Sequence, residues 1–293
     1  MPGVTLVTVT YNAVDVWAPF MASLIAQQGV DWHLVVIDNR SQDGTVELLK
    51  AIDNPRITVV LNDANVGVAA ANNQGIKIGL DNGSPAICLI NNDVEFAPGM
   101  LSRLEAQRRE RAVDAVSPLI PFFSEPDRIW YGGGSFVRAR GIMIVHEHEG
   151  EALQVVGDAP FLTEYAPTCC VLFDRSVFER IGIMDERYFV YWDDTDFLWR
   201  MKQANMKLLV DPAIIVLHKV SSSTGGRLSD FTIRYIFRNQ IFFTRKFHGT
   251  GWALYSAVMA MVSGVVRIAR NGDTLRHLAL RARALREGFS MTR

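Results

Sequence analysis

Three short polar groups in this 293-residue chain carry residue types suited to chemistry on a charged substrate. The first, Asn91-Asn92-Asp93, directly follows the continuously apolar run Ile87–Ile90. Such a run is typical of a buried strand in a parallel sheet, and ligands bind beyond the carboxyl ends of these strands. A carboxylate there can hold a divalent cation against a diphosphate. The alternative is an Asx-rich turn that only ends the strand.

The second group is Asp193-Asp194, followed by Asp196, at the start of a predicted helix. We expect the crowding of these carboxylates to raise the pKa of Asp194 towards the range of a general base. Helix capping is the alternative explanation for such acids. The third group is His218, which ends a predicted strand. Asp93 and His218 are the predicted metal ligands, and this donor set suits Mg²⁺ or Mn²⁺, with the imidazole favouring Mn²⁺.

Alternating apolar strands and helices position these groups. The spacing predicts an α/β fold with a mostly parallel, doubly wound sheet flanked by helices. Polar residues also follow the first three strands, at Tyr11-Asn12, Asp38 and Asn65–Gly67, and we expect all of them to meet in one crevice. The predicted strands are Val4–Thr10, Leu34–Ile37, Ile57–Leu61, Ile87–Ile90, Val113–Leu119, Cys169–Phe173, Tyr188–Tyr191, Lys207–Val210 and Ile214–Leu217.

Several other classes of site are disfavoured. The chain has neither the glycine-rich dinucleotide fingerprint after its first strand nor a P-loop. Its three cysteines are too few and badly spaced for a disulfide framework or a zinc site, which predicts buried thiols in a reducing compartment. His146 and His148 alternate as two ligands on one strand face would, but an exposed polar hairpin is the preferred interpretation.

Several motifs, taken together and in order, resemble the family 2 glycosyltransferases with the GT-A fold, above all the bacterial rhamnosyltransferase type. They are TVTYN, VIDNRSQDGT, NVGVAAANNQGI, LINNDVEFAPG, IGIMDERYFVYWDDTDFLWR and LHKVSSSTGG, and they cover about Val4 to Arg238. The resemblance implies a nucleotide-sugar donor, a divalent metal and inversion at the anomeric carbon. The predicted catalytic domain covers residues 1–228, and the helical pattern of the residues after it predicts a basic helical extension over 229–293.

The resemblance assigns roles residue by residue. Asp38 resembles the residue that recognises a pyrimidine base, and Tyr11 the ring that packs on it. Asn91-Asn92-Asp93 resembles the D-x-D motif with fewer charges, and Asp194 resembles the catalytic base. Ser222 and Ser223 lie in the loop that closes over the diphosphate. The remaining candidates are Thr10, Asn12, Asn65, Gly67 and Asn73 for the nucleotide sugar, and Trp192 and Asp193 for the acceptor or a second acid.

The extension is basic, whereas the rest of the chain is acidic. From Arg227 onwards there are twelve Lys and Arg against three Asp and Glu. The apolar stretch Trp252–Val266, fifteen residues long, is too short to span a bilayer as a helix but suits a segment lying in an anionic membrane surface. Arg267, Arg270 and the arginines of a final helix flank it. Packing on the catalytic domain or a homodimer interface is the alternative.

The prediction is therefore an inverting, metal-dependent glycosyltransferase that acts on a lipid-linked or polysaccharide acceptor. It is expected in the cytoplasm, peripherally on the inner face of the membrane. L-Rhamnose from dTDP-rhamnose is the first choice of donor, ahead of galactofuranose, glucose or N-acetylhexosamine. The rivals are a sugar nucleotidyltransferase, disfavoured because no basic residue follows the first strand, and an inactive sugar-binding or scaffold protein. No nucleic-acid partner is expected because no reading module accompanies the basic tail.

Overall fold

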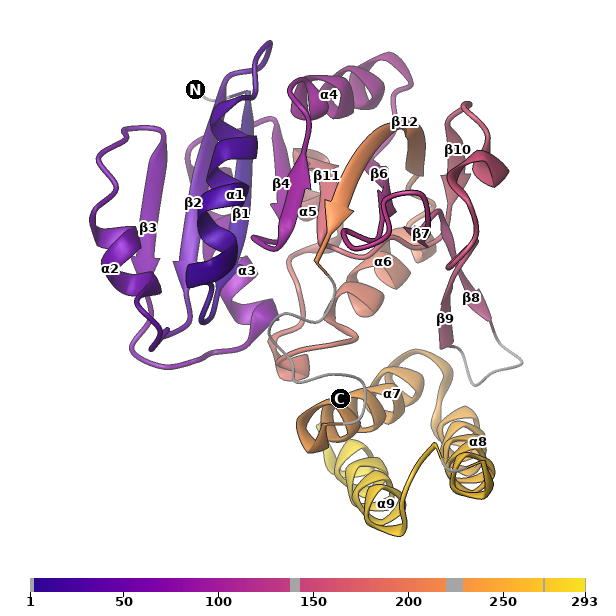
Figure 1. The fold of residues 1–293 in the computed structure, drawn as a ribbon. Coiled ribbons are helices and arrows are strands. Elements are labelled where there is room, and N and C mark those ends of the chain that lie inside the picture. Colours follow the sequence, from indigo (N-terminus) through magenta and orange to yellow (C-terminus); the bar gives the residue numbers. More distant parts are fainter. Residues whose placement is uncertain (1–2, 138–142, 220–228, 271, 293) are drawn as a thin grey trace.

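A ten-stranded mixed sheet forms the centre of the molecule (Figure 1). The computed structural model describes residues 3–137, 143–219, 229–270 and 272–292. Within them the strand order is β10-β12-β6-β11-β4-β1-β2-β3, with β5 paired to β12 and β7 to β6. The strands are β1 (Val4–Thr10), β2 (Trp32–Asp38), β3 (Ile57–Leu61), β4 (Ala86–Ile90), β5 (Val94–Phe96), β6 (Ala115–Pro121), β7 (Ile129–Tyr131), β10 (Phe161–Thr163), β11 (Cys170–Asp174) and β12 (Leu208–His218).

The predicted parallel core is confirmed. β1 pairs in parallel with β2 and β4, β2 with β3, and β6 with β12. Since β11 runs antiparallel to both β4 and β6, those two strands share one direction. The carboxyl ends of β1, β2, β4 and β12 therefore meet at one edge of the sheet, as the polar residues that follow them predict.

Two strand predictions are wrong. The stretches expected as separate strands at Lys207–Val210 and Ile214–Leu217 belong to one strand, β12, whose pairing with β6 shifts register between Asp211 and Ile215. Tyr188–Tyr191 is not a strand. It follows a short 3₁₀ turn, η3 (Glu186–Tyr188), and Phe189 and Tyr191 take left-handed backbone conformations. A high content of β-branched and aromatic residues does not by itself determine the secondary structure of a stretch whose backbone is fixed by contacts with distant parts of the chain.

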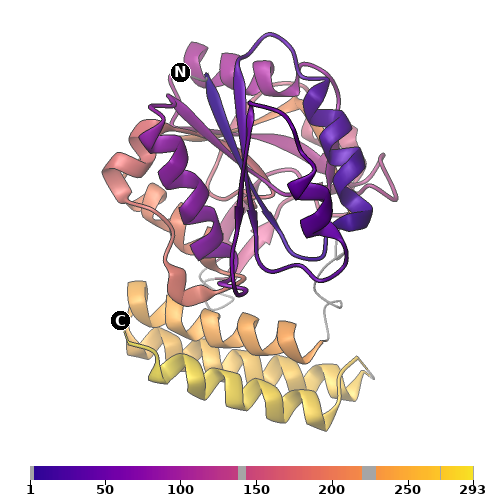
Figure 2. The same ribbon diagram turned by 90° about the vertical axis from the view of Figure 1, so that its left-hand side faces the viewer.

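Helices cover both faces of the sheet (Figure 2). On one face the apolar cluster joins α1 (Val14–Ile25), α2 (Thr45–Lys50) and α4 (Met100–Glu110) to alternate strand residues. On the other, α3 (Val68–Asp81), α5 (Arg175–Ile181) and α6 (Asp193–Gln203) pack on the remaining residues. The central strands β4 and β11 are buried on both faces, so their sequences are almost continuously apolar rather than alternating. A separate ribbon of β8 (Gly134–Val137) and β9 (Met143–His146) and the 3₁₀ turn η2 (Leu153–Val156) lie between β7 and β10 in the chain.

Three C-terminal helices, α7 (Asp230–His248), α8 (Thr250–Ala269) and α9 (Leu275–Ser290), lie beyond the carboxyl ends of the parallel strands (Figure 1). α7 is shared between two cores. Its Phe242 and Phe243 belong to the cluster beneath α6, whereas its Ile241 packs with Ala253 of α8 and Leu285 of α9. The helix that contains the apolar stretch Trp252–Val266, α8, extends beyond it at both ends and is 20 residues long.

Candidate active site

Asp93 and His218 meet at the carboxyl edge of the sheet. The short strand β5 pairs antiparallel with β12, so that Val94 lies opposite His218. This register brings Asp93 Oδ1 to 3.3 Å from His218 Nε2, with only 12 % and 8 % of the two side chains exposed. A carboxylate oxygen and an imidazole nitrogen held this close form two of the ligands that Mn²⁺ accepts. The part of the chain that the structure describes contains no group of three or more His, Cys, Asp or Glu side chains able to hold a metal.

Asp194 lies in the first turn of α6 and is held by three donors. The Tyr165 hydroxyl donates to Asp194 Oδ2 at 2.6 Å, and the Thr195 backbone N–H and hydroxyl donate to Oδ1 at 2.6 and 3.1 Å. The residue just before α6, Trp192, is the N-cap of the helix in a left-handed conformation, and the centroid of its buried ring lies 5.2 Å from that of Phe243 in α7. Trp192 therefore anchors the start of α6 in the core.

Burial, more than crowding, sets the acidity of this pair. Removal from water raises the pKa of Asp194, while the hydrogen bonds from Tyr165 and Thr195 oppose that rise. Burial and the charge of Asp194 raise the pKa of Asp193 to about 8. Asp193 is therefore largely protonated at neutral pH, and the three donors favour the ionised form of Asp194.

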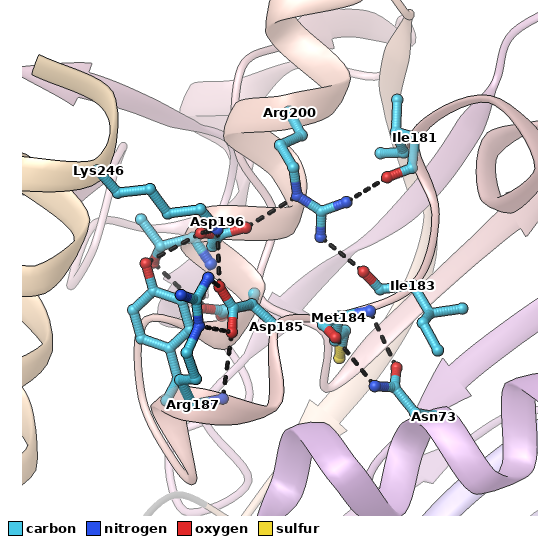
Figure 3. A network of polar contacts seen from close by, with 12 residues as sticks. Asn73, Ile181, Ile183, Met184, Asp185, Arg187, Asp196, Arg200 and Lys246 are labelled. Atoms are coloured by element: carbon cyan, nitrogen blue, oxygen red, sulfur yellow. Dashed lines mark hydrogen bonds and ion pairs between the residues drawn. The ribbon is translucent and has the colours of Figure 1, made fainter. Parts of the chain in front are cut away.

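Asp196 has a structural role rather than crowding Asp194. Its Oδ1 accepts from Arg200 at 2.8 Å, and its Oδ2 accepts from the Tyr188 hydroxyl at 2.9 Å and from the Lys246 ammonium of α7. Lys246 also binds Asp185 at 2.8 Å (Figure 3). Two cations thus compensate the fully buried Asp196, so the expectation that Asp196 crowds Asp194 is corrected to a minor effect on Asp193 alone.

An aromatic path that the sequence did not reveal joins the two halves of the site. The Trp130 ring lies 4.4 Å from the His218 ring and 4.9 Å from the His146 ring, between centroids. His146 in turn stacks on Tyr165, with 5.9 Å between centroids and 28° between planes, and Tyr165 binds Asp194. The aromatic segment IWYGGG is the only feature of the sequence that could have pointed to Trp130, but its local pattern does not show that it lies against His218.

The preferred interpretation of His146 and His148 as an exposed hairpin is wrong for His146. Its ring lies between Trp130 and Tyr165, and its Nδ1 is 3.1 Å from the Trp130 carbonyl oxygen. Burial lowers the pKa of His146, against the charge of Asp194. His148 lies apart from it in a turn, 3.2 Å from Glu151, so the described contacts do not bring the two histidines to one ion.

The ends of β1 and β2 form a second polar cluster. Asp38, almost fully buried, accepts from the Thr10 hydroxyl at 2.8 Å and from the Ser41 N–H at 3.0 Å. Asn12 has a positive φ of 54° and its side-chain oxygen accepts from the Gln42 N–H at 2.8 Å. The Tyr11 ring is 42 % exposed, which leaves it accessible to a ligand.

Gly67 is required where α3 begins. Asn65 Oδ1 accepts the Gly67 N–H at 3.0 Å, and Gly67 has a φ of +87°. A Cβ at this position would lie 2.5 Å from the Phe189 carbonyl oxygen, so any larger residue would push away the segment that leads into α6. Gly67 thereby lets the nucleotide side of the site lie directly against the segment that carries the proposed base.

The other asparagines divide. Asn91 is exposed and its N–H donates to the Cys169 carbonyl, whereas the Asn92 amide donates to the Val9 carbonyl at 3.1 Å. Asn73 lies elsewhere: its buried amide exchanges hydrogen bonds with the Met184 backbone and donates to Glu186, which connects α3 to the turn before α6 (Figure 3). We therefore leave Asn73 out of the binding set. Ser222 and Ser223 lie outside the described residues.

The sheet topology and the polar edge together are those of the GT-A fold. The chain superposes on a crystal structure of GalNAc-T7 with UDP, GalNAc and Mn²⁺ at a TM-score of 0.58, covering 95 % of this chain and 56 % of that one. At 15 % identity, this likeness shows the fold alone.

The family follows from the sequence comparison. The model of glycosyl transferase family 2 matches residues 5–182, and the chain belongs to this family. N-acetylglucosaminyl-diphospho-decaprenol L-rhamnosyltransferase of Mycobacterium tuberculosis is 29 % identical over 75 % of this chain and 77 % of its own. The dTDP-rhamnosyl transferase RfbF of Shigella flexneri is 22 % identical over 66 % and 61 %. The enzyme is thus a glycosyltransferase with relatives in glycan synthesis.

Proposed function

We propose that this enzyme is an inverting, metal-dependent glycosyltransferase that transfers a sugar from a nucleoside diphosphate to a hydroxyl of a lipid-linked or polysaccharide acceptor. The single observation that carries the proposal is the gathering of the Asp93–His218 pair and of Asp194 at one sheet edge. The Trp130 ring contacts both His218 and His146, and His146 stacks on Tyr165, whose hydroxyl donates to Asp194. One site therefore contains a cation-binding pair and a separate base.

The metal proposal rests on the chemistry of the donor set. Asp93 and His218 would hold the ion through Oδ1 and Nε2, the two atoms that face each other. Mn²⁺ or Mg²⁺ bound there supplies charge stabilisation for the departing diphosphate. The neighbouring His218 Nδ1 is buried and has no hydrogen-bond partner among the described residues, so the ring is held by packing against Trp130.

Asp194 would act as the general base. It accepts the proton of the acceptor hydroxyl while that oxygen forms its bond to the anomeric carbon and the bond from that carbon to the diphosphate oxygen breaks. The nucleoside diphosphate leaves on the opposite side, so a single displacement inverts the configuration. The acceptor-side proposal for Asp193, protonated at neutral pH, is that it donates a hydrogen bond to the acceptor.

The nucleotide base is proposed to bind between Tyr11 and Asp38. We expect Asp38→Ala to weaken binding of all pyrimidine nucleotides by about 10- to 100-fold, because it removes a hydrogen bond to a buried carboxylate. Isothermal titration with UDP and dTDP measures this. Asp43→Ala is the matched control: Asp43 accepts from the Thr45 N–H and hydroxyl at the start of α2, so its loss is expected to cost stability and leave affinity intact. Equal affinity of Asp38→Ala and wild type would relocate the base pocket.

The donor sugar is proposed to be L-rhamnose from dTDP-rhamnose, since two of the relatives are named for rhamnosyl transfer. The relative from M. tuberculosis also motivates a lipid-linked acceptor. A panel of nucleotide sugars with Mn²⁺, scored for release of nucleoside diphosphate with and without polyprenyl-diphosphate glycans, tests both. Turnover of another donor would change the sugar, and silence throughout would favour an inactive sugar-binding or scaffold protein.

The extension is proposed to rest on the inner surface of the cytoplasmic membrane. On length and composition alone, the 20-residue helix α8 could cross a membrane. However, α8 buries Ala253, Ser256, Ala260 and Gly264 along one side, which holds it against the molecule. Its opposite side exposes a continuous apolar face of Trp252, Leu254, Tyr255, Val258, Met259, Val262, Val265 and Val266. A helix fixed along its length offers a membrane one face, which suits the surface rather than the interior.

Charge favours anionic lipid as the occupant of this face. The last 67 residues carry an excess of nine positive charges, and Arg267 and Arg270 lie at the end of α8. One predicted contributor is corrected: Arg281 is buried between the helices, where it donates to the Ala260 carbonyl and to Asp273 at 2.8 Å each. It therefore stabilises the three-helix unit instead of facing a membrane.

We expect the triple variant Leu254→Glu, Val258→Glu, Val262→Glu to lose binding to vesicles containing phosphatidylglycerol while donor hydrolysis persists. These side chains are 51–60 % exposed, so the charges cost little folding stability. Vesicle co-sedimentation at low salt measures the loss. The matched control is Ile25→Glu, Val155→Glu, Leu162→Glu on the catalytic domain, with equal exposure and equal charge. If wild type ignores these vesicles, or elutes as a dimer that the α8 variant dissociates, the face is a subunit contact instead.

A further inference from the structure

We propose that Tyr165 is a positioning residue for Asp194, whose hydroxyl fixes the orientation of the carboxylate and keeps it ionised inside a buried site. The inference rests on the proposed role of Asp194 as the base. Tyr165 lies in the segment that leads into β11, outside all of the motifs identified in the sequence.

The geometry gives each oxygen of Asp194 a different donor. Tyr165 occupies Oδ2 at 2.6 Å, and the Thr195 N–H occupies Oδ1 at 2.6 Å, so the carboxylate cannot rotate without losing both. Tyr165 is itself held firmly. It is 2 % exposed, its carbonyl accepts the Tyr131 hydroxyl at 2.6 Å, and its ring contacts His146 and Phe136.

The titratable groups that face Asp194 carry no positive charge, so the Tyr165 hydroxyl contributes much of the stabilisation of the carboxylate. Asp193 is protonated at neutral pH, and burial raises the pKa of the Cys169 thiol and lowers the pKa of the His146 imidazole, so all three are neutral there. Burial and the charge of Asp194 raise the pKa of Tyr165 well above its usual range, which keeps its hydroxyl protonated as a donor. The carboxylate therefore depends on Tyr165 and Thr195 for compensation.

The same helix contains a matched pair for comparison. Tyr188 is also fully buried and donates to a buried aspartate of α6, Asp196, at 2.9 Å. Asp196 differs in that Arg200 and Lys246 already compensate its charge. Removing the hydroxyl of Tyr188 therefore tests the general cost of a buried tyrosine hydroxyl, whereas removing that of Tyr165 tests its effect on the proposed base.

The experiment compares the pH dependence of kcat in wild type, Tyr165→Phe and Tyr188→Phe. The base must be ionised, so activity is lost as pH falls through the pKa of Asp194. Removing a donor to the carboxylate raises that pKa. We expect the acid limb of Tyr165→Phe to move up by about one pH unit, with about 10-fold less activity below it, recovery at high pH and an unchanged KM for the donor. Tyr188→Phe should lower the melting temperature and keep the wild-type profile.

A second substitution acts in the opposite direction and keeps the packing. A 3-fluorotyrosine installed at position 165 has a more acidic hydroxyl and is a stronger donor, so we expect the acid limb to move down. Wild-type profiles for both Tyr165 variants, or equal shifts for Tyr165→Phe and Tyr188→Phe, would overturn the proposal. A fully active Asp194→Asn enzyme would instead overturn the base assignment, so the two failures are distinguishable.

Discussion

Replacing Asp194 with asparagine is expected to lower kcat by about 10²- to 10⁴-fold while donor binding persists. The substitution keeps the shape of the side chain and removes the negative charge that accepts the proton. Its single amide oxygen can accept from the Thr195 N–H, and its NH₂ group then faces the Tyr165 hydroxyl oxygen, which can accept from it. Single-turnover transfer measured alongside nucleotide titration separates the chemical step from binding. A residual rate near wild type together with a collapse of donor affinity would make Asp194 a binding residue.

Asp211→Asn provides the control for this result. Asp211 is also a buried aspartate, on β12, where its carboxylate accepts the Ala213 N–H at 3.0 Å at the register shift. It lies outside the proposed machinery, so its loss tests whether neutralising any buried carboxylate slows the enzyme. We expect a lower melting temperature and a kcat close to that of wild type.

Removing either metal-binding side chain should produce the second large effect. Asp93→Ala and His218→Ala are each expected to weaken Mn²⁺-dependent binding of nucleoside diphosphate by about 100-fold, because each takes away one of the two facing donors. Titration of Mn²⁺ followed by electron paramagnetic resonance, with and without UDP, measures this independently of turnover.

His33→Ala serves as the matched histidine control for the metal measurement. His33 lies on β2 with its Nε2 3.0 Å from the Thr58 hydroxyl, away from the proposed ligands. Binding that responds equally to the loss of His33 and of His218 reports a general change in the fold. A His218→Ala enzyme with unchanged Mn²⁺ dependence would remove His218 from the site.

The sequence predicts the strand framework well because the parallel strands are runs of apolar and β-branched residues separated by polar turns. β1 and β3 have the predicted bounds, and the polar residues at their ends lie on one edge. The antiparallel direction of β11 was not predicted, since chain direction depends on the connection from β10 and not on the strand's own residues. The two predicted strands that form β12 are joined across a register shift in the pairing of β12 with β6, and this shift also depends on the partner strand rather than on the residues of β12 alone.

The candidate site divides in a similar way. Asp93, Asp194 and His218 follow strands or begin a helix, so local pattern alone identifies them. Tyr165, Trp130 and His146 come from the region where that pattern is blurred, and only the tertiary fold brings them to the site. The segment predicted as the strand Tyr188–Tyr191 failed because its backbone is held by α7, about fifty residues away in the chain.

The hydrogen bonds from α7 to the segment before α6 also affect how the enzyme folds during its synthesis. Phe189, Tyr191 and Trp192 each adopt a left-handed backbone that costs about 1 kcal/mol or more. The buried Asn239 amide of α7 donates to the carbonyls of Tyr188, Val190 and Tyr191 at 2.8–2.9 Å, which offsets that cost.

A nascent chain released up to β12 already contains every strand of the sheet, but it lacks Asn239. Translation must proceed through α7 before the turn that carries Asp194 can settle. A chain of this glycosyltransferase that terminates before α7 therefore contains the strands but lacks the Asn239 contacts and the side chains Phe242 and Phe243, which belong to the core beneath α6, and we expect it to be inactive.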